Sequence, residues 1–423
     1  MKRSILWIVG LAVAASCGLR EIGGETGSED IWTGPGAGIV PDGSGPMQKT
    51  VWYVTGFDYP AGYDWRSDQE SGTVKCSLVV YANAVPMMKL PVGNEYEVSA
   101  DPDMHRMIGN DLYTDYSTDS LTVIRKNGKR LFCYQGREMI VAMHTEGGDV
   151  YTLGQNRSGK GFAYRKNGEV IYRHSSGSLF TSSDVLPSTS SDGQALAPSG
   201  GLAFAFSEPV QMASGALERY YIYMNGCVSQ IAVREDVKKV WDVRVSAGSV
   251  SYIASLVGIS TPVLVYDDNM VSLDMPNSTV MKSCRFVPDQ DDMVIEGAFA
   301  VSSGLLTSGL WRNGVRECIF PTGMTANSLC SWDDGVCCVL THCRTGEMKI
   351  FRCGEIFAVP DGYRIMGTRP LSVIDGILYV GLTPVGGGQP VVWKDGEIEP
   401  LKLSNGYISS ITSYQASQDT VRD

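Results

Sequence analysis

Residues on which many catalytic centres depend are scarce in this sequence. It has four histidines among 423 residues, and no serine lies in a Gly-x-Ser-x-Gly context with plausible partners. A glycine-rich loop of the kind that binds phosphate groups is also missing. A Ser-His-Asp enzyme is therefore weakly supported. The sequence identifies no catalytic residue and predicts no cofactor.

Positive charge is scarce as well. Lys and Arg together number 35 against 46 Asp and Glu, which gives a formal net charge of -11. Proteins that bind nucleic acid use a basic stripe to neutralise phosphate charge. We therefore expect no nucleic-acid partner.

The chain also lacks any stretch typical of a long amphipathic helix, whereas 43% of its residues are hydrophobic and 48 are glycine. What it contains is a hairpin signal that returns eight times. An aromatic or large apolar residue is followed, two or three positions later, by Asn-Gly, Asp-Gly or a degenerate equivalent. Both central residues of a type I′ turn need positive φ, which Asn, Asp and Gly reach at low cost. The turn positions are Asn83, Asn127, Asn167, Asn225, Asp268, Asn313, Cys353 and Asp395.

The spacing of these turns predicts the architecture. Successive positions are 40 to 45 residues apart, except for one interval of 58. This period is typical of a β-propeller, a ring of four-stranded antiparallel blades, and it disfavours unrelated hairpins in a sandwich or barrel. A second, weaker turn signal halfway along each repeat, as at Asp375-Gly376, predicts the first hairpin of each blade. We predict an all-β propeller of eight blades; seven stay possible because the turns of blades 1, 5 and 7 depart from the pattern.

The two ends of the repeat region predict how the ring closes. With the strands of a blade named A to D in chain order, residues 50–56 look like a B strand with no A strand ahead of it. Residues 406–414 follow the last D strand and look like a lone A strand. The simplest closure lets this C-terminal strand complete blade 1, which removes exposed sheet edges. The propeller is thus predicted to span residues 48–414, with 415–423 as a polar tail and 175–201 as an elaborated loop in blade 4.

The N-terminus has the features of a targeting segment. Lys2 and Arg3 precede an apolar run over residues 5–15, which is too short to span a membrane. The small residues Ala14-Ala15-Ser16 then lead into Cys17, and this sequence resembles the lipobox of bacterial lipoproteins, although it lacks the common Leu three positions before the cysteine. The resemblance implies a lipoprotein signal peptide over 1–16 and a lipidated flexible tether over 17–47. A plain secretory signal with an incidental cysteine is the alternative.

The repeat itself resembles a known pattern. Trp393-Lys394-Asp395-Gly396 and Tyr164-Arg165-Lys166-Asn167-Gly168 are similar to the aromatic-Lys-Asn-Gly propeller repeats of Bacteroidetes-type lipoproteins. Together with Cys17, the resemblance implies anchoring in the lipid bilayer of the cell envelope, at the outer membrane, with the periplasmic or surface side left open. The motif is structural and implies no activity.

A loop after the first predicted strand contains the candidate binding residues. Aromatic faces beside carboxylates and an arginine suit sugar rings or a protein partner. The alternative is a loop that folds over its own blade as a small satellite core. The candidate ligand-binding residues are Tyr59, Tyr63, Asp64, Trp65 and Arg66.

Ten cysteines remain after Cys17, and none has the Cys-x-x-Cys spacing of a structural zinc site. If residues 333–335 form a three-residue loop, Cys330 and Cys338 lie opposite each other and make the best disulfide candidate. The alternative is that most cysteines are small buried hydrophobes.

Other possible metal ligands favour structural roles. His105 and His144 are expected to be structural, and the acids around Asp292 (Asp289, Asp291) to be a solvated loop instead of a calcium site. No metal site is therefore predicted.

These features favour a membrane-tethered binding or scaffold module for a glycan, a peptide or an envelope partner. The alternative is a carbohydrate-active hydrolase or lyase that uses paired carboxylates at the propeller funnel, which would need two acids with separated pKa values. A third possibility is a structural component of an envelope complex, for which apolar surface gathered on one face would be the sign. Whether the protein is an enzyme stays uncertain, and the sequence leans against it.

Overall fold

The computed structural model places most of the predicted repeat region. The predicted signal peptide, the tether with Cys17, the loop residue Arg66 and all but the first residue of the predicted tail lie outside the described residues. So do Asp289 and Asp291 and most of the predicted loop in blade 4. The structure describes residues 50–65, 76–157, 160–180, 203–212, 215–224, 226–231, 236–246, 249–266, 269–277, 279–287, 292–301, 304–333, 335–403 and 405–415.

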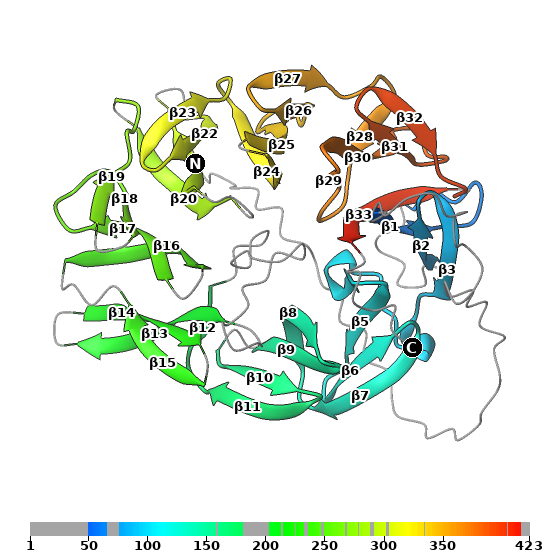
Figure 1. Ribbon diagram of the computed structural model, residues 1–423, viewed down its shortest axis with the longest axis horizontal. Coiled ribbons are helices and arrows are strands. Elements are labelled where there is room, and N and C mark those ends of the chain that lie inside the picture. Colours follow the sequence, from blue (N-terminus) through cyan, green and yellow to red (C-terminus); the bar gives the residue numbers. More distant parts are fainter. Residues whose placement is uncertain are drawn as a thin grey trace, which may run out of the picture.

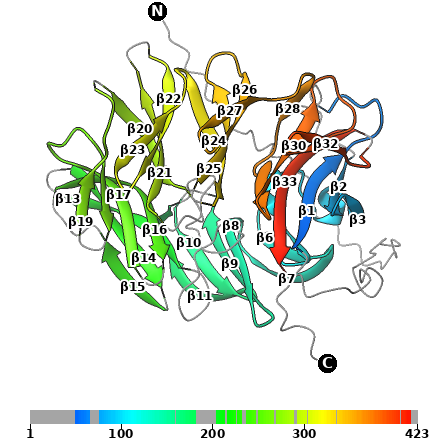
Figure 2. The ribbon, with the colours of Figure 1, turned by 45° about the horizontal axis from the view of Figure 1, so that its top comes forward.

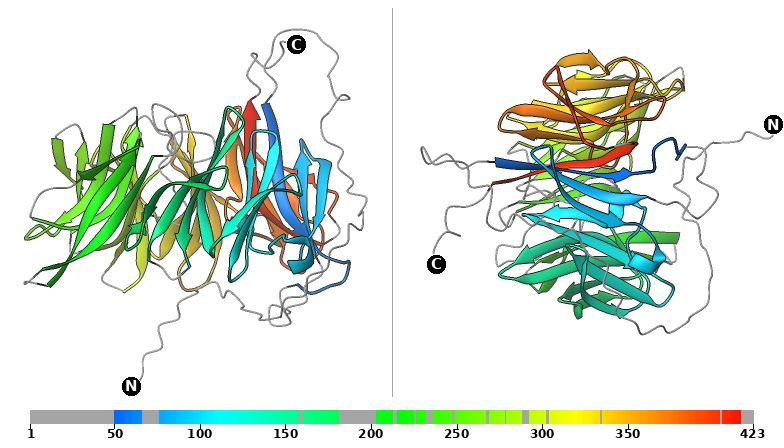
Figure 3. Two further views of the ribbon diagram at one scale, coloured as in Figure 1. Left: turned by 90° about the horizontal axis from the view of Figure 1, so that it is seen from below. Right: turned by 90° about the vertical axis from the view of Figure 1, so that its right-hand side faces the viewer.

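The described strands form eight antiparallel sheets that stand as blades around a central axis (Figure 1). Seen from the side, the ring is a thick disc whose strands cross from one face to the other (Figure 3). The helical elements of the described residues are two single 3-10 turns, η1 (Asn94–Tyr96) and η2 (Pro102–Met104). No helix in this part of the chain has the length and apolar character needed to cross a membrane. The all-β propeller with eight four-stranded blades is confirmed.

From the inside of the ring outward, blade 1 contains β33 (Gly406–Gln415), β1 (Thr50–Asp58), β2 (Ser77–Ala82) and β3 (Val85–Pro91). Blade 2 contains β4 (His105–Ile108), β5 (Asp111–Ser117), β6 (Leu121–Lys126) and β7 (Lys129–Gln135). Blade 3 contains β8 (Glu138–Glu146), β9 (Asp149–Asn156), β10 (Phe162–Lys166) and β11 (Glu169–His174). Blade 4 contains β12 (Ser178–Leu179), β13 (Phe204–Met212), β14 (Gly215–Met224) and β15 (Cys227–Ile231).

Blade 5 contains β16 (Val237–Ser246), β17 (Ser249–Leu256), β18 (Val263–Tyr266) and β19 (Asn269–Ser272). Blade 6 contains β20 (Val280–Phe286), β21 (Val294–Ala300), β22 (Leu306–Arg312) and β23 (Val315–Ile319). Blade 7 contains β24 (Met324–Trp332), β25 (Gly335–His342), β26 (Met348–Arg352) and β27 (Glu355–Ala358). In blade 8, β28 (Tyr363–Ile365) and β29 (Leu371–Ile374) share the inner position beside β30 (Ile377–Pro384), β31 (Val391–Lys394) and β32 (Glu397–Pro400).

The ring closes through its C-terminal strand, as the count of strands predicts. The strand β33 lies beside β1 as the innermost strand of blade 1 (Figure 2). The two strands are antiparallel, with Thr50 opposite Gln415 and Tyr53 opposite Thr412. Strands from the two ends of the chain therefore share one sheet, and opening the ring requires breaking a full β ladder.

The recurring turn residue connects the two hairpins of a blade. In blade 2, Asn127 and Gly128 have φ of 52° and 78°, as a type I′ turn requires. The Asn127 N–H donates to Leu112 O at 2.7 Å, and Asn127 Oδ1 accepts the Leu112 N–H at 2.8 Å. Its Nδ2 donates to Asp111 Oδ1 at 2.7 Å, and Lys126 Nζ lies 2.7 Å from Asp111 Oδ2. Equivalent sets occur in blade 3 (Asn167, Val150, Asp149, Lys166) and blade 6 (Asn313, Met293, Asp292, Arg312). The Lys/Arg-Asn-Gly motif thus binds an aspartate at the start of strand B.

The large residue ahead of each turn packs between blades. Trp311 is fully buried and shares a cluster with Leu264 of blade 5. Tyr81 of blade 1 lies in one cluster with Tyr379 of blade 8. Aromatic side chains of this size dominate the burial of a core, which explains why they recur at this position of the repeat.

Candidate functional site

An aromatic cluster lies where β1 ends, on the face of the ring that carries the B–C and D–A loops. The cluster begins in the loop after β1, which is described up to Trp65. Asn405, buried in the linker before β33, fixes this loop: its Nδ2 donates to Tyr63 O at 2.7 Å and to Pro60 O at 3.2 Å. The Tyr59 N–H donates to Asn405 O at 2.7 Å. The loop is therefore tied to the closing segment of the ring by three hydrogen bonds.

The rings of the loop form a parallel stack. Tyr59 lies 5.9 Å from Tyr63 and 5.5 Å from Trp65, with interplanar angles of 10° and 15°. Trp65 also packs on Tyr407 of β33 at 5.1 Å, and the Arg364 guanidinium of β28 lies 6.0 Å from the Trp65 ring. Residues from blades 8 and 1 are thus brought together around Trp65.

Burial divides the predicted binding residues into two groups. Tyr59 and Trp65 are 8% and 7% exposed and belong to the core cluster of blade 1, as the satellite-core alternative expects. Tyr63 is half-buried at the end of the stack, and Asp64 is exposed. Of the five predicted residues, these last two lie where a ligand can reach them, while Arg66 is not described. The binding role of the five residues stays a prediction.

Burial also sets the chemistry of the cluster. It raises the pKa of Tyr59. It also raises the pKa of Cys76 to about 11, and burial is the largest of the effects on this thiol, which is hydrogen-bonded to Tyr59. The pKa of Tyr407 is raised as well, first by burial, then by Cys76 and then by nearby acids that include Asp101. All three groups are therefore uncharged near neutral pH, and the cluster offers rings and hydroxyls instead of nucleophiles.

Three residues of this site were missed by sequence reasoning. Asn405 and Arg364 gave no local signal, because their partners lie far away in the chain. Tyr407 falls within the predicted closing strand, and Phe57 lies directly opposite it in the β1–β33 ladder. The predicted pairing of the last strand with the first could therefore have pointed to Tyr407, because it brings the start of the last strand next to the end of the first.

The two histidines noted in the sequence lie on the inner strands of neighbouring blades, His105 on β4 and His144 on β8. His105 is fully buried, its Nε2 lies 2.8 Å from Ser99 O, and burial lowers its pKa to about 4. His144 stacks on Tyr151 at 6.4 Å, and burial lowers its pKa too. Both are neutral at neutral pH, and the Nε2 of His105 bonds to a backbone carbonyl as a structural histidine does.

Buried charged pairs connect the inner strands. In blade 2, Arg106 Nη1 donates to Asp115 Oδ1 at 2.9 Å, and its Nη2 donates to Ile140 O of blade 3 at 2.6 Å. Burial raises the pKa of Asp115 to about 6, against the lowering effect of Arg106. In blade 3, the buried Arg165 and Glu138 form a two-pronged pair with an N–O distance of 2.8 Å. Each pair joins different strands, and Arg106 also joins two blades.

The same arrangement recurs on the other side of the ring. Arg285 Nε donates to Glu296 Oε2 at 3.1 Å, and its Nη2 donates to Ala326 O of blade 7 at 3.3 Å. Asp242 of blade 5 accepts the Phe286 N–H of blade 6 at 2.8 Å, and burial raises the pKa of this carboxyl to about 7. The described buried acids are thus bonded to arginines or backbone amides and hold the ring together.

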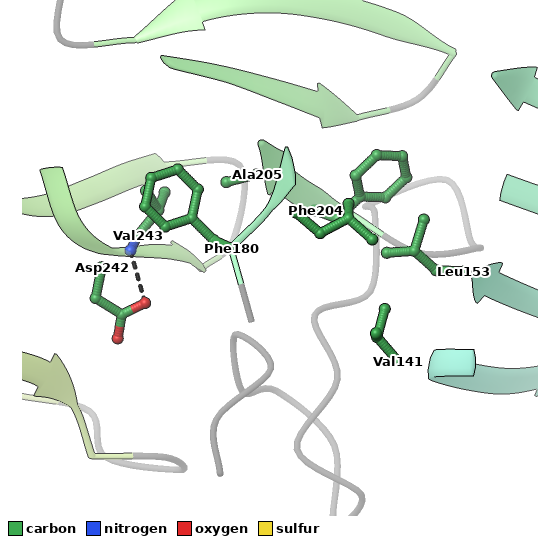
Figure 4. Close-up of a pocket in the computed structure, with 8 residues that line it drawn as sticks. Val141, Leu153, Phe180, Phe204, Ala205, Asp242 and Val243 are labelled. Atoms are coloured by element: carbon green, nitrogen blue, oxygen red, sulfur yellow. Dashed lines mark hydrogen bonds between the residues drawn. The ribbon is translucent and has the colours of Figure 1, made fainter. Parts of the chain in front are cut away.

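A small cavity lies beside Asp242, between blades 3, 4 and 5 (Figure 4). Its volume of about 10 Å³ has room for about one water molecule. The carboxylate accepts the Val243 N–H at 2.9 Å through its other oxygen, and the remaining lining is apolar. The lining residues are Val141, Leu153, Leu179, Phe180, Phe204, Ala205, Asp242 and Val243. A cavity of this size cannot hold an organic substrate.

The predicted Cys330–Cys338 pairing is wrong in register. Trp332 lies opposite Gly335, which leaves a two-residue turn in place of the expected three-residue loop, and so Cys330 lies opposite Cys337. Because side chains alternate between the faces of a strand, Cys338 points away into the cluster shared with blade 6. The ten cysteines of the described residues carry free thiols.

The acidic turn of blade 6 is built around a charge pair. Asp292 bonds to Arg312 at 2.9 Å and to Asn313, as in the recurring turn motif. Within the described ranges, no group of three His, Cys, Asp or Glu side chains is arranged to hold a metal ion.

The chain is an eight-bladed β-propeller closed by its own C-terminal strand. No protein-family model and no curated protein matches the sequence. Among solved structures it is similar to acylaminoacyl peptidase from Pyrococcus horikoshii, with 12% identity and a TM-score of 0.42 over 80% of this chain and 56% of that one. It is also similar to the β-propeller domain of the Trilobed protease from Pyrococcus furiosus (10% identity, TM-score 0.39, 84% and 93% covered). A third is apo AztD from Citrobacter koseri (9%, 0.40, 87% and 99%).

These likenesses concern the fold alone. The chain spans just over half the length of the acylaminoacyl peptidase, at 56%.

Proposed function

We propose that this protein is an exported lipoprotein, anchored in the cell envelope through Cys17, whose propeller serves as a binding or scaffold module. The lipobox-like sequence at Cys17, the polar segment 17–47 and the propeller repeat support this arrangement. A short lipid-bearing tether keeps the ring close to the membrane while leaving its faces accessible. The partner is a glycan, a peptide or an envelope protein.

The observation that carries the binding proposal is the fixed aromatic stack of blade 1. Three parallel rings are held by Asn405 and backed by Tyr407. A loop that is ordered before binding loses little conformational freedom when a ligand arrives. Tyr63 and Asp64 lie at the accessible end of the loop, where a ring face and a carboxylate suit the apolar face and the hydroxyls of a sugar.

Hydrolysis by paired carboxylates has less support. A glycosidase needs two carboxyl groups about 5 to 10 Å apart that flank one substrate bond. The buried acids of the described ring are bonded to arginines or backbone amides, and these bonds connect strands and blades. Their local function is structural, so binding without turnover is the better-supported activity.

A binding screen tests the proposed surface. The protein is titrated with oligosaccharides and peptidoglycan fragments while its melting temperature is followed, because a ligand of the native state raises it by mass action. We expect a glycan that stabilises the wild type to bind the variants Tyr63→Ala and Asp64→Ala at least tenfold more weakly than it binds the wild type. The matched control is Tyr96→Ala, which removes an exposed tyrosine from the linker between β3 and β4.

The outcomes separate the classes of partner. Unchanged affinity in Tyr63→Ala and Asp64→Ala for a glycan that binds the wild type would exclude the blade 1 cluster as its site. No response to any glycan would favour a protein partner, to be sought by crosslinking in the envelope. Release of a shortened sugar would favour the hydrolase alternative.

The anchor is tested separately. Cells are labelled with an alkyne analogue of palmitate, and membrane and soluble fractions are compared. We expect label and membrane association in the wild type and loss of both in Cys17→Ser, whereas Cys227→Ser keeps them. Equal labelling of the two variants would contradict the lipoprotein assignment. Protease treatment of intact cells then tells which side of the outer membrane carries the ring.

A further inference from the structure

Blade 7 departs from the repeat at three positions that meet in space. In blade 2, the first residue of β5 is Asp111, the third is Tyr113 and the turn residue is Asn127. Blade 3 has Asp149, Tyr151 and Asn167 at these positions. Blade 7 instead has Gly335, Cys337 and Cys353. The carboxylate, the phenol ring and the amide of the polar turn cluster are thus replaced together by a glycine and two thiols.

Cys337 is the centre of a cluster of three sulfur atoms. Cys330 lies directly opposite it in the β24–β25 ladder. Residues directly opposite in an antiparallel pair have Cα atoms about 4.5 to 5.5 Å apart, within the range that a disulfide spans. The Cys337 side chain is hydrogen-bonded to both Cys330 and Cys353. Gly335 completes the site, because a side chain there would collide with Cys353 Sγ.

The three thiols differ in exposure. Cys337 is fully buried, Cys330 is half-buried, and Cys353 is exposed at the first position of its turn, with φ of 45°. The Arg352 guanidinium lies next to the cluster, bonded to Asp395 of blade 8 at 2.8 Å. A neighbouring cation favours the thiolate form that attacks a disulfide.

We propose that Cys330, Cys337 and Cys353 form a thiol–disulfide exchange site in which Cys337 pairs with either neighbour. An external disulfide, either a low-molecular-weight disulfide or that of a protein oxidoreductase, accepts two electrons and two protons and leaves as two thiols. The thiolate of the exposed Cys353 attacks one sulfur of the external disulfide, which forms a mixed disulfide and releases the first external thiol. The Cys337 thiolate then attacks the Cys353 sulfur of the mixed disulfide and releases the second external thiol. The Cys330 thiolate then attacks Cys337, which forms the cross-strand disulfide and releases Cys353, which takes up the proton. This inference does not depend on the glycan site or on the anchor.

Oxidation is expected to be slow at neutral pH. Burial raises the pKa of Cys353 to about 11, and the pKa of Cys337 is raised by its hydrogen bond to Cys330 and by burial. The thiolate fraction below such a pKa grows about tenfold per pH unit. We therefore expect the rate of exchange with glutathione disulfide to rise close to tenfold per pH unit between pH 7 and pH 9.

Disulfide mapping tests the site. The reduced full chain is equilibrated with glutathione disulfide at pH 8.5, quenched with acid, alkylated, digested and examined by mass spectrometry. We expect the wild type to lose two thiols in links between Cys337 and Cys330 or Cys353. Cys330→Ser should retain only the Cys337–Cys353 link. Cys353→Ser lacks the exposed entry thiol and should form only the Cys330–Cys337 link, more slowly than the wild type is oxidised, through the half-buried Cys330. Cys227→Ser, which removes an exposed thiol beside the turn of blade 4, is the control and should behave as the wild type.

Other outcomes overturn the proposal. Retention of all three thiols, a stable glutathione adduct on Cys353 without an internal link, or a link through Cys338 would each contradict it. Cys337→Ser should form no link between the remaining two. If Cys337→Ser fails to fold, the variants Cys330→Ser and Cys353→Ser still test the proposal, because each retains one of the two expected disulfide links.

Discussion

Asn405 Nδ2 donates to the Tyr63 carbonyl oxygen at 2.7 Å, across 342 positions of the sequence. This bond joins the candidate binding loop to the segment that closes the ring. The position of the aromatic stack therefore depends on ring closure, and the order of the loop and the integrity of the propeller are coupled.

Replacing Asn405 with Ala should loosen the loop after β1. The change removes the Asn405 donor from Tyr63 O and from Pro60 O, which still accepts the Tyr63 N–H at 3.1 Å. Loss of a typical hydrogen bond costs about 0.5 to 1.5 kcal/mol. We expect a lower urea midpoint and faster protease cleavage near residues 59–66. The control is Asn94→Ala, whose side chain accepts one exposed bond from Tyr116. Equal cleavage of both variants would show that Asn405 does not order the loop.

Cys353→Asn should stabilise the propeller. In blade 7 the Cys353 N–H still donates to Val336 O at 3.0 Å, but the thiol cannot replace the amide oxygen that accepts the matching N–H in blades 2, 3 and 6. Restoring that acceptor should add about 0.5 to 1.5 kcal/mol to the free energy of unfolding. Denaturant melts measure it. The reciprocal change, Asn127→Cys, should lower stability, and a rise in both variants would contradict the argument.

Deletion of residues 406–415 should unfold or oligomerise the whole ring. It removes the inner strand of blade 1 and exposes the edge of β1, which can then pair with another chain. Size-exclusion chromatography with light scattering and circular dichroism measure the result. Deletion of 416–423 is the control and should leave a folded monomer. A folded monomer without residues 406–415 would show that the last strand is not required for closure.

Asp242→Asn should change how stability depends on pH. The carboxyl has a pKa of about 7 in the fold against an ordinary 3.8, because burial disfavours its charge. Between these values the folded state holds a proton that the unfolded state has lost, so this group's contribution to stability falls as pH rises from about 4 to 7.

Melting temperatures from pH 4.5 to 8 test this contribution. We expect the difference between wild type and Asp242→Asn to shrink as pH rises to 7 and to level off above it. Asp119→Asn is the control, because its carboxylate is 89% exposed and should give no such trend. His105 acts in the opposite direction, since its lowered pKa removes stability as pH falls below 6.5. Because wild type and Asp242→Asn both contain His105, its contribution cancels in the difference between their melting temperatures.

Sequence reasoning succeeded where the deciding interaction is local. A type I′ turn needs two residues of positive φ in a row, and Asn127-Gly128 and Asn313-Gly314 both have them. The large residue before each turn then enters the interface between blades because of its place on strand C. The closing strand was also predictable, because an A strand was missing at one end and a surplus strand followed at the other.

It failed where one residue decides a register. A loop of three residues and a turn of two differ by a single position. That difference places Cys337 opposite Cys330 in the structure, whereas the sequence predicted Cys338 there. Strand side chains alternate between faces, so the shift also moves the thiol into a different interior cluster.

By itself, then, the sequence determined the class of fold and the strand that closes the ring, and it predicted eight blades with seven as the alternative, because these follow from short-range turn chemistry repeated at an even period. Only the tertiary structure decided which side chains meet. Asp242 meets Phe286 across the interface between blades 5 and 6. Asn405 meets Tyr63 because strands from the two ends of the chain pair in blade 1, and Cys337 meets Cys353 because of the strand register within blade 7. Burial between those strands then sets their pKa values and their accessibility, and neither quantity exists before the blades are assembled.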